Sequence, residues 1–181
     1  MFDEFNGLPL HPLLVHAAVV LVPLAGLLGV LFAIPRTRAW SRWPLMLVSL
    51  GAAVTVYVTK EAGESFEEVL AFPETTPEGM LIAEHEERAE LLLIITLVYA
   101  VVAVAAFVVS RDTEKFTGVP AIAVSVLLLV GAGALAFQVY RVGDIGSEAV
   151  WNPTGDVDYG AHHRLSSLDG DANVSWRFRP G

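Results

Sequence analysis

The chain of 181 residues contains no cysteine. Disulfide bonds, thiolate zinc sites, cysteine-ligated iron–sulfur clusters and haem attached through cysteine are therefore excluded. A metal ion or cofactor would have to be held by histidine, carboxylate, methionine or backbone groups. The sequence also lacks a glycine-rich phosphate loop, a nucleophile elbow and an HExxH zinc motif, so it offers no familiar catalytic signature.

Charged residues are absent from four long apolar runs, at residues 8–34, 45–59, 91–110 and 119–140. A membrane-spanning helix needs about 20 apolar residues, and three of the runs reach this length. We expect the second to be lengthened by its flanks, with Lys60 snorkelling. Helices of a soluble bundle would show a polar stripe, and these runs show none. The sequence therefore predicts an all-α fold, an integral membrane four-helix bundle.

Charge is distributed unevenly over the connections between the apolar runs. The first connection carries Arg36, Arg38 and Arg42 and no acidic residue, whereas residues 60–90 carry ten glutamates. The positive-inside rule then places the arginine-bearing connections in the cytoplasm. We expect a multi-pass protein of a prokaryotic plasma membrane, with both termini and an acidic loop extracytoplasmic. The anionic outer face and the net charge of −9 argue against nucleic acid as a partner.

Two further expectations concern the ends of the chain. The first residues are acidic where a signal peptide would be basic, so the first apolar run is predicted to be a retained span. Residues 1–150 are predicted to form the transmembrane domain, and residues 151–181 a polar extracytoplasmic tail.

Helix boundaries can also be predicted from local signals. The second helix is expected to continue through residues 61–70, where apolar residues and glutamates alternate at helical spacing. Thr76 has the position of an N-cap for one long helix over residues 77–110. Glu84 and Arg88 are spaced to form an i,i+4 ion pair on this helix.

All five histidines are predicted to lie on the outer side of the membrane: His11, His16, His85, His162 and His163. Imidazole is the commonest metal ligand and titrates near neutral pH. Ionisable groups in or beside membrane spans usually serve function. The last two histidines lie in the polar tail, where a surface pair is the favoured interpretation. The first three are the candidate site residues.

The leading hypothesis is a redox protein that binds a b-type haem or a metal ion. His16 and His85 belong to different helices at similar depth, as two axial haem ligands require. His11 is given a supporting role, because it lies about 140° around the helix from His16. Such an outer-side site would exchange electrons with an external redox protein or a quinone.

Other hypotheses remain open. His85 with Glu61 and Glu64, or with Glu84 or Glu86, could instead bind iron, manganese or zinc. In a different class, the protein would be a non-catalytic accessory subunit of a larger membrane complex or a homo-oligomer, packed through small-residue helix faces. Cation binding or transport is a third hypothesis, although the spans lack the carboxylates that a transport pathway would use.

The motifs resemble those of a prokaryotic membrane family known as domain of unknown function 2231. The opening LHPLLVH at residues 10–16, followed by Pro23 within the span, resembles the start of that family. The KEAGE stretch at residues 60–64 and the EHEE stretch at residues 84–87 resemble its outer segment. Residues 139–146, VYRVGDIG, resemble its closing motif.

The resemblance covers residues 8–150 and implies a four-span membrane fold. Members resemble haem-bearing four-helix membrane proteins and can be joined to Rieske or cytochrome-like modules. By that likeness, His11, His16 and His85 are the positions expected to bind a cofactor. Where family members commonly carry an aromatic residue and a proline after the second histidine, this chain has Ala17 and Ala18.

Overall fold

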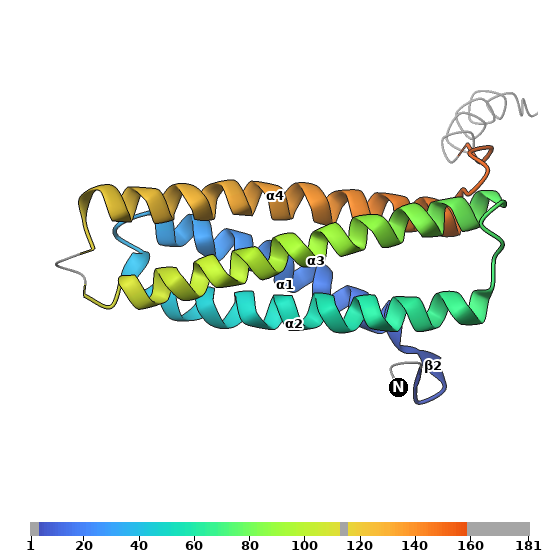
Figure 1. The fold of residues 1–181 in the computed structure, drawn as a ribbon, viewed down its shortest axis with the longest axis horizontal. Coiled ribbons are helices and arrows are strands. Elements are labelled where there is room, and N and C mark those ends of the chain that lie inside the picture. Colours follow the sequence, from blue (N-terminus) through green and yellow to red (C-terminus); the bar gives the residue numbers. More distant parts are fainter. Residues whose placement is uncertain (1–3, 113–115, 159–181) are drawn as a thin grey trace, which may run out of the picture.

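The computed structural model describes residues 4–112 and 116–158, which form four long helices and one short β-hairpin (Figure 1). The elements are β1 (Glu4–Phe5), β2 (Leu8–Pro9), α1 (Leu10–Ala33), α2 (Arg38–Leu70), α3 (Pro77–Val109) and α4 (Gly118–Trp151). Each helix is long and apolar enough to cross a membrane. The predicted all-α membrane bundle is therefore confirmed.

The helices alternate in direction, and each packs mainly against two neighbours, in the order α1, α2, α3, α4 and back to α1 (Figure 1). The bundle consequently has two ends of different composition. The histidine end contains the beginnings of α1 and α3 and the ends of α2 and α4. The arginine end contains the opposite termini, including Arg38 and Arg42 in the first turns of α2.

The predicted helix boundaries are confirmed around the acidic connection. Helix α2 continues to Leu70 and stops at Ala71, which has a left-handed backbone with φ 49°. The side chain of Thr76 caps α3 by accepting a hydrogen bond from the Gly79 amide at 3.1 Å. Glu84 lies 3.5 Å from Arg88, as their spacing predicted. Helices α2 and α3 therefore extend well beyond their apolar runs at the histidine end.

A two-stranded hairpin precedes α1. Asn6 and Gly7 form its turn, with φ of 55° and 79°. Positive φ at both central residues is the requirement of a type I′ turn, which Asn-Gly meets at little cost. Glu4 then pairs with Pro9 in an antiparallel register. The hairpin delivers the chain directly into α1, so that His11 is the second residue of that helix.

The described chain ends shortly after α4. This helix runs to Trp151, and the division of the chain predicted after residue 150 stays a prediction. His162, His163 and the tail beyond residue 158 lie outside the described residues.

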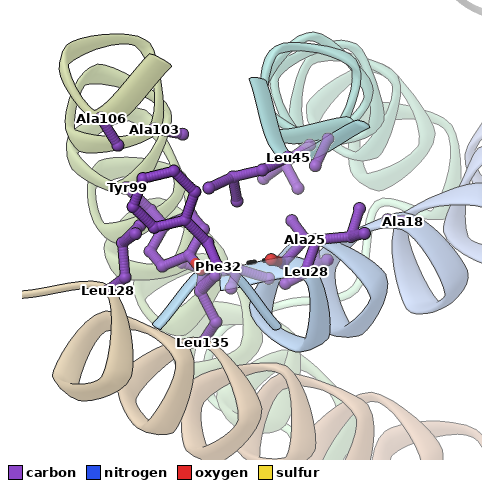
Figure 2. Close-up of a cluster of buried hydrophobic side chains, with 14 of the residues drawn as sticks. Ala18, Ala25, Leu28, Phe32, Leu45, Tyr99, Ala103, Ala106, Leu128 and Leu135 are labelled. Atoms are coloured by element: carbon purple, nitrogen blue, oxygen red, sulfur yellow. Dashed lines mark hydrogen bonds between the residues drawn. The ribbon is translucent and has the colours of Figure 1, made fainter. Parts of the chain in front are cut away.

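Large apolar side chains cover the outside of the bundle. Val20, Val54, Val101 and Val130, one from each helix, are 62 to 69% exposed. Such a surface suits lipid rather than water. The interior instead holds many small residues, among them Ala18, Ala25, Ala103 and Ala106 (Figure 2). Small side chains allow helix backbones to approach closely, which is how membrane helices gain packing energy.

Tyr99 lies at the centre of this interior and is only 3% exposed. Its hydroxyl donates a hydrogen bond to the Ala25 carbonyl at 3.2 Å, so the buried polar group is satisfied (Figure 2). The ring is accommodated between Gly29 on α1 and Gly131 on α4, neither of which could carry a Cβ without displacing it. Tyr99 thus joins three helices across the middle of the bundle.

Candidate functional site

Two of the predicted site residues meet at the histidine end. His11, at the start of α1, and His85, on the third turn of α3, have ring centroids 6.3 Å apart with the ring planes at 83°. His11 also stacks on Phe66 of α2, with a centroid distance of 6.3 Å and nearly parallel planes. Both imidazoles are partly buried. The three helices therefore hold the two rings against each other.

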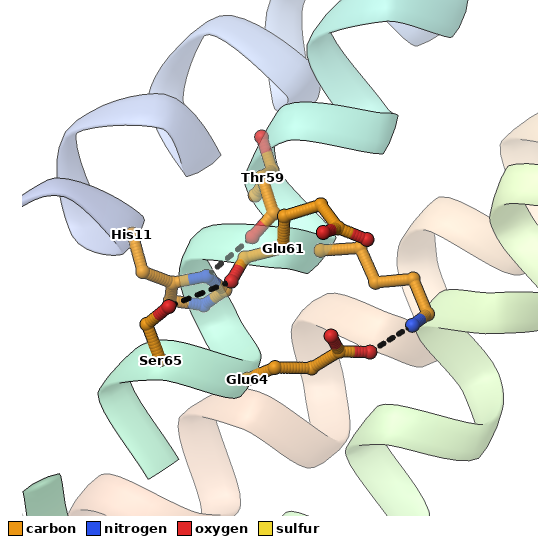
Figure 3. Close-up of polar contacts among 6 residues, drawn as sticks. His11, Thr59, Glu61, Glu64 and Ser65 are labelled. Atoms are coloured by element: carbon orange, nitrogen blue, oxygen red, sulfur yellow. Dashed lines mark hydrogen bonds and ion pairs between the residues drawn. The ribbon is translucent and has the colours of Figure 1, made fainter. Parts of the chain in front are cut away.

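Each ring is oriented by a backbone carbonyl of a neighbouring helix. The Nδ1 of His11 lies 2.9 Å from the Thr59 oxygen (Figure 3), and the Nδ1 of His85 lies 3.1 Å from the Val142 oxygen. A carbonyl oxygen only accepts, so Nδ1 carries the proton in both rings. In a neutral imidazole, Nε2 then presents a free lone pair, which is the arrangement found in metal-binding histidines.

Each ring also packs against a glycine. A Cβ at Gly63 would lie 3.0 Å from Cε1 and Nδ1 of His11. A Cβ at Gly146 would lie 2.9 Å from Cε1 of His85. These separations are too short for an alanine without displacement of the ring. The two glycines therefore provide the space in which the histidines sit.

The surroundings of His11 and of His85 are built in the same way. In α2, the accepting carbonyl of Thr59 precedes Gly63 by four residues, and in α4 the carbonyl of Val142 precedes Gly146 by four residues. A spacing of four places both groups on the same helix face. The α1–α2 hairpin and the α3–α4 hairpin thus each contribute one histidine held by its partner helix.

The surroundings of His85 favour its neutral form. His85 lies six residues before the apolar run of α3, outside the membrane-spanning stretch. Burial lowers the pKa of His85, and the neighbouring His11 lowers it further, against the opposing effect of the hydrogen bond to Val142. A neutral ring is the form that binds a metal.

The structure places His16 apart from this pair. His16 is exposed on α1, and its Nδ1 bonds the Pro12 carbonyl of its own helix at 2.7 Å. His11 rather than His16 is the residue that faces His85. The predicted angular separation of His11 and His16 explains this result, because α1 turns only one of the two into the bundle.

The carboxylates of the alternative metal hypothesis belong to two helices, Glu61 and Glu64 to α2 and Glu84 and Glu86 to α3. Glu64 forms an ion pair with Lys60, and the backbone oxygen of Glu61 accepts from Ser65 (Figure 3). Over residues 4–112 and 116–158, no three histidine or acidic side chains are grouped closely enough to hold an ion. Glu84 contacts both Arg88 and Arg141, at 3.5 and 3.9 Å.

Sequence reasoning missed the glycines and carbonyls that position the rings. Gly63 lies within the KEAGE motif and Gly146 ends the VYRVGDIG motif, but neither motif indicates that its glycine contacts a histidine. A glycine inside a helix costs about 1 kcal/mol relative to alanine, so each one invites a packing explanation. That signal was present, but the histidine partner of each glycine lies on a different helix and could not be assigned from spacing.

We predict that Gly146→Ala displaces the His85 ring and weakens its bond to Val142. The new methyl group would occupy space now filled by the ring. Nitrogen chemical shifts of the imidazole, measured by NMR, should show that His85 no longer holds the proton fixed on Nδ1. Gly143→Ala on the same helix is the control, since a Cβ there meets nothing within 4 Å. Identical spectra for the two variants would contradict the proposed contact.

The fold defines a helical membrane protein with four helices that are long and apolar enough to cross a membrane. The family model described as "Predicted membrane protein (DUF2231)" matches residues 7–158, and the chain belongs to this family. The resemblance drawn from its motifs is thereby confirmed. No curated protein and no solved structure matches the chain.

Proposed function

We propose that this protein is a membrane-embedded redox protein that binds a b-type haem at the histidine end, with His11 and His85 as ligands. The observation that carries the proposal is the pair of imidazoles from two helices, each with Nδ1 committed to a carbonyl. The ring centroids lie 6.3 Å apart, so both histidines would be available to one cofactor bound at this end.

The number of protein side chains available as metal ligands favours haem over a metal ion held by protein ligands alone. Haem b requires only axial ligands, since its porphyrin supplies four nitrogens, and when bound it would supply one-electron chemistry. A zinc or non-haem iron site takes three or more protein ligands. Such a site would have to recruit Glu61 or Glu64 beside His85, with Glu64 giving up its ion pair with Lys60. Iron or zinc is therefore the second choice of cofactor.

The same proposal includes an orientation in the membrane. With the arginine-bearing connections in the cytoplasm, the histidine end and both termini would be extracytoplasmic, at the plasma membrane of a prokaryote. The electron partner would be an external redox protein or a quinone that reaches this end. The acidic extensions of α2 and α3 surround the site with negative charge, which favours a basic protein partner.

The test is an absorption spectrum of the detergent-purified protein, oxidised and then reduced with dithionite, with metal analysis of the same sample. After expression with ample haem, we expect a Soret band that shifts on reduction, with sharp α and β bands and iron near one equivalent per chain. A featureless spectrum without bound metal would overturn the proposal.

A second candidate function is that of a non-catalytic subunit in a larger membrane complex or homo-oligomer. A groove of about 460 Å³ on the lipid-facing side of α2 and α3 favours it. Its lining is apolar and comprises Leu50, Ala53, Val54, Tyr57, Leu97, Ala100, Val101 and Val104. Small residues at its floor would admit a helix of a partner. A colourless protein that co-purifies in a stable complex would support this function over the first.

A further inference from the structure

A pocket lined by two arginines lies at the arginine end, at the opposite end of the bundle from the histidines. Its volume is about 240 Å³, and its lining includes Arg38, Arg42, Ser110, Phe116 and Thr117. Helices α2, α3 and α4 all contribute through their termini. The proposed haem function does not use this pocket.

Neither arginine of the pocket forms an ion pair with a carboxylate of residues 4–112 or 116–158. Arg38 donates from Nε to the Phe32 carbonyl at 3.1 Å and from Nη2 to the Ala33 carbonyl and the Ser125 hydroxyl, both at 3.4 Å. Its Nη1 has no such bond to the described residues, and its guanidinium lies 5.2 Å from the centre of the Phe116 ring. Arg42 donates from Nη1 to the Ser110 carbonyl at 3.1 Å. An arginine has five donors, so both side chains keep donors for a ligand.

One of these donors is buried without a partner. The Nε of Arg42 is inaccessible and makes no hydrogen bond within the described part of the chain. A buried unsatisfied donor costs about 1–3 kcal/mol, and more when the group is charged. The guanidinium of Arg42 is therefore left incompletely hydrogen-bonded by the described residues.

Residues at two helix N-termini line the same pocket, namely Arg38 and Ala39 of α2 and Thr117 before α4. Neither helix has an acidic residue in its first turn. The Arg38 amide already donates to the Ile34 carbonyl at 3.1 Å. The dipoles of the two helices, rather than this amide, therefore add to the attraction that the two guanidinium groups exert on a negatively charged ligand.

The depth of the pocket matches that of lipid headgroups. Trp40 and Trp43, on the same turns of α2 as the two arginines, are 55% and 51% exposed. Tryptophan is enriched at the boundary between hydrocarbon and water, at the level of the headgroups. A phospholipid in the surrounding bilayer would thus hold its phosphate at the height of Arg38 and Arg42.

We propose that this pocket binds the phosphate group of an anionic phospholipid, with Arg38 and Arg42 as the recognising residues. Guanidinium groups match phosphate oxygens in charge and in geometry. Basic pockets between transmembrane helices bind acidic headgroups by this chemistry. A free phosphate ion presents the same oxygens, so the experiment must distinguish the two sources.

Native mass spectrometry of the full-length protein in a neutral detergent provides the test, with dioleoyl phosphatidylglycerol and dioleoyl phosphatidylcholine as probes. We expect selective retention of phosphatidylglycerol. Arg42→Gln should weaken that retention by about tenfold or more, as expected for loss of charge-assisted hydrogen bonds. Arg42→Lys keeps the positive charge but loses the planar guanidinium, which can donate two parallel hydrogen bonds. This variant should weaken the retention of phosphatidylglycerol less than Arg42→Gln does. Arg36→Gln is the matched control, because Arg36 is exposed in the same connection and does not line the pocket.

Three results would overturn the proposal. The first is equal retention of the two lipids by the wild type. The second is an equal loss for Arg36→Gln and Arg42→Gln, which would indicate general electrostatic attraction. The third is full displacement of phosphatidylglycerol by excess inorganic phosphate, which would identify a site for the free ion. If Arg42→Gln does not fold, the retention of phosphatidylglycerol by Arg38→Gln and Arg42→Lys is compared with that of Arg36→Gln instead.

Discussion

Replacement of either His11 or His85 by alanine is expected to abolish the Soret band of the purified protein. Each imidazole would supply one axial ligand, and each is held by its own carbonyl and its own glycine. Among the described residues, no other histidine could replace either ring, because His16 is exposed and bonds the Pro12 carbonyl of its own helix. We expect the haem content of both variants, measured against protein concentration, to fall to the level of an unrelated membrane protein purified in parallel.

His16→Ala is the matched control for this experiment. His16 lies on the same helix as His11, but its side chain is exposed and bonds only its own helix among the described residues. The variant should therefore keep the full spectrum. Loss of the band in His16→Ala, together with its retention in His11→Ala, would contradict the His11–His85 pairing and favour His16 as the ligand.

Gly29→Ala is expected to destabilise the bundle more than any conservative substitution on its surface. A Cβ at residue 29 would overlap the hydroxyl of Tyr99, which is buried between α1 and α4. Overpacking of this kind costs about 1–3 kcal/mol and occasionally more. The free energy of unfolding, measured by titrating SDS into mixed micelles, should fall accordingly.

Tyr99→Phe should rescue part of this loss. Removal of the hydroxyl leaves Cζ as the nearest ring atom, 3.2 Å from the new methyl group. Tyr99→Phe alone should cost about 1 kcal/mol, since the hydrogen bond to the Ala25 carbonyl is lost. The double variant should lose less than the sum of the two single variants. Gly133→Ala is the control, because a Cβ there meets nothing within 4 Å. If the losses of unfolding free energy in the two single variants add strictly in the double variant, the contact between residue 29 and the Tyr99 hydroxyl is not the cause of the destabilisation.

Much of the fold could be predicted from composition and local signals. Apolar runs in a bilayer must form helices, because every backbone polar group has to be satisfied within the segment. The N-cap at Thr76 and the continuation of α2 to Leu70 depend on neighbours within one turn, and both were predicted. The hairpin at Asn6 and Gly7 carries an equally local signal, since Asn-Gly readily adopts the positive φ that a type I′ turn requires.

The candidate site was predicted only in part. Charge and position placed the histidines at one end of the bundle, and the structure brings two of them together there. The choice between His11 and His16 was not determined by sequence, because it depends on how α1 is rotated about its own axis. That rotation follows from packing against α2 and α4, where Gly63 receives the His11 ring and Gly26 lies against Ala132.

The sequence alone thus determined the class of protein, the number of spans and the end at which the imidazoles gather, since these follow from hydrophobicity and chain direction. Only the tertiary structure decided which imidazoles face each other, which glycines make room for them and which arginines share a pocket. These features join residues from different helices, such as His85 with Gly146 and Arg42 with Ser110. Side-chain contacts between helices depend on axial rotation and relative shift, and a periodic apolar pattern that covers the whole helix circumference specifies neither.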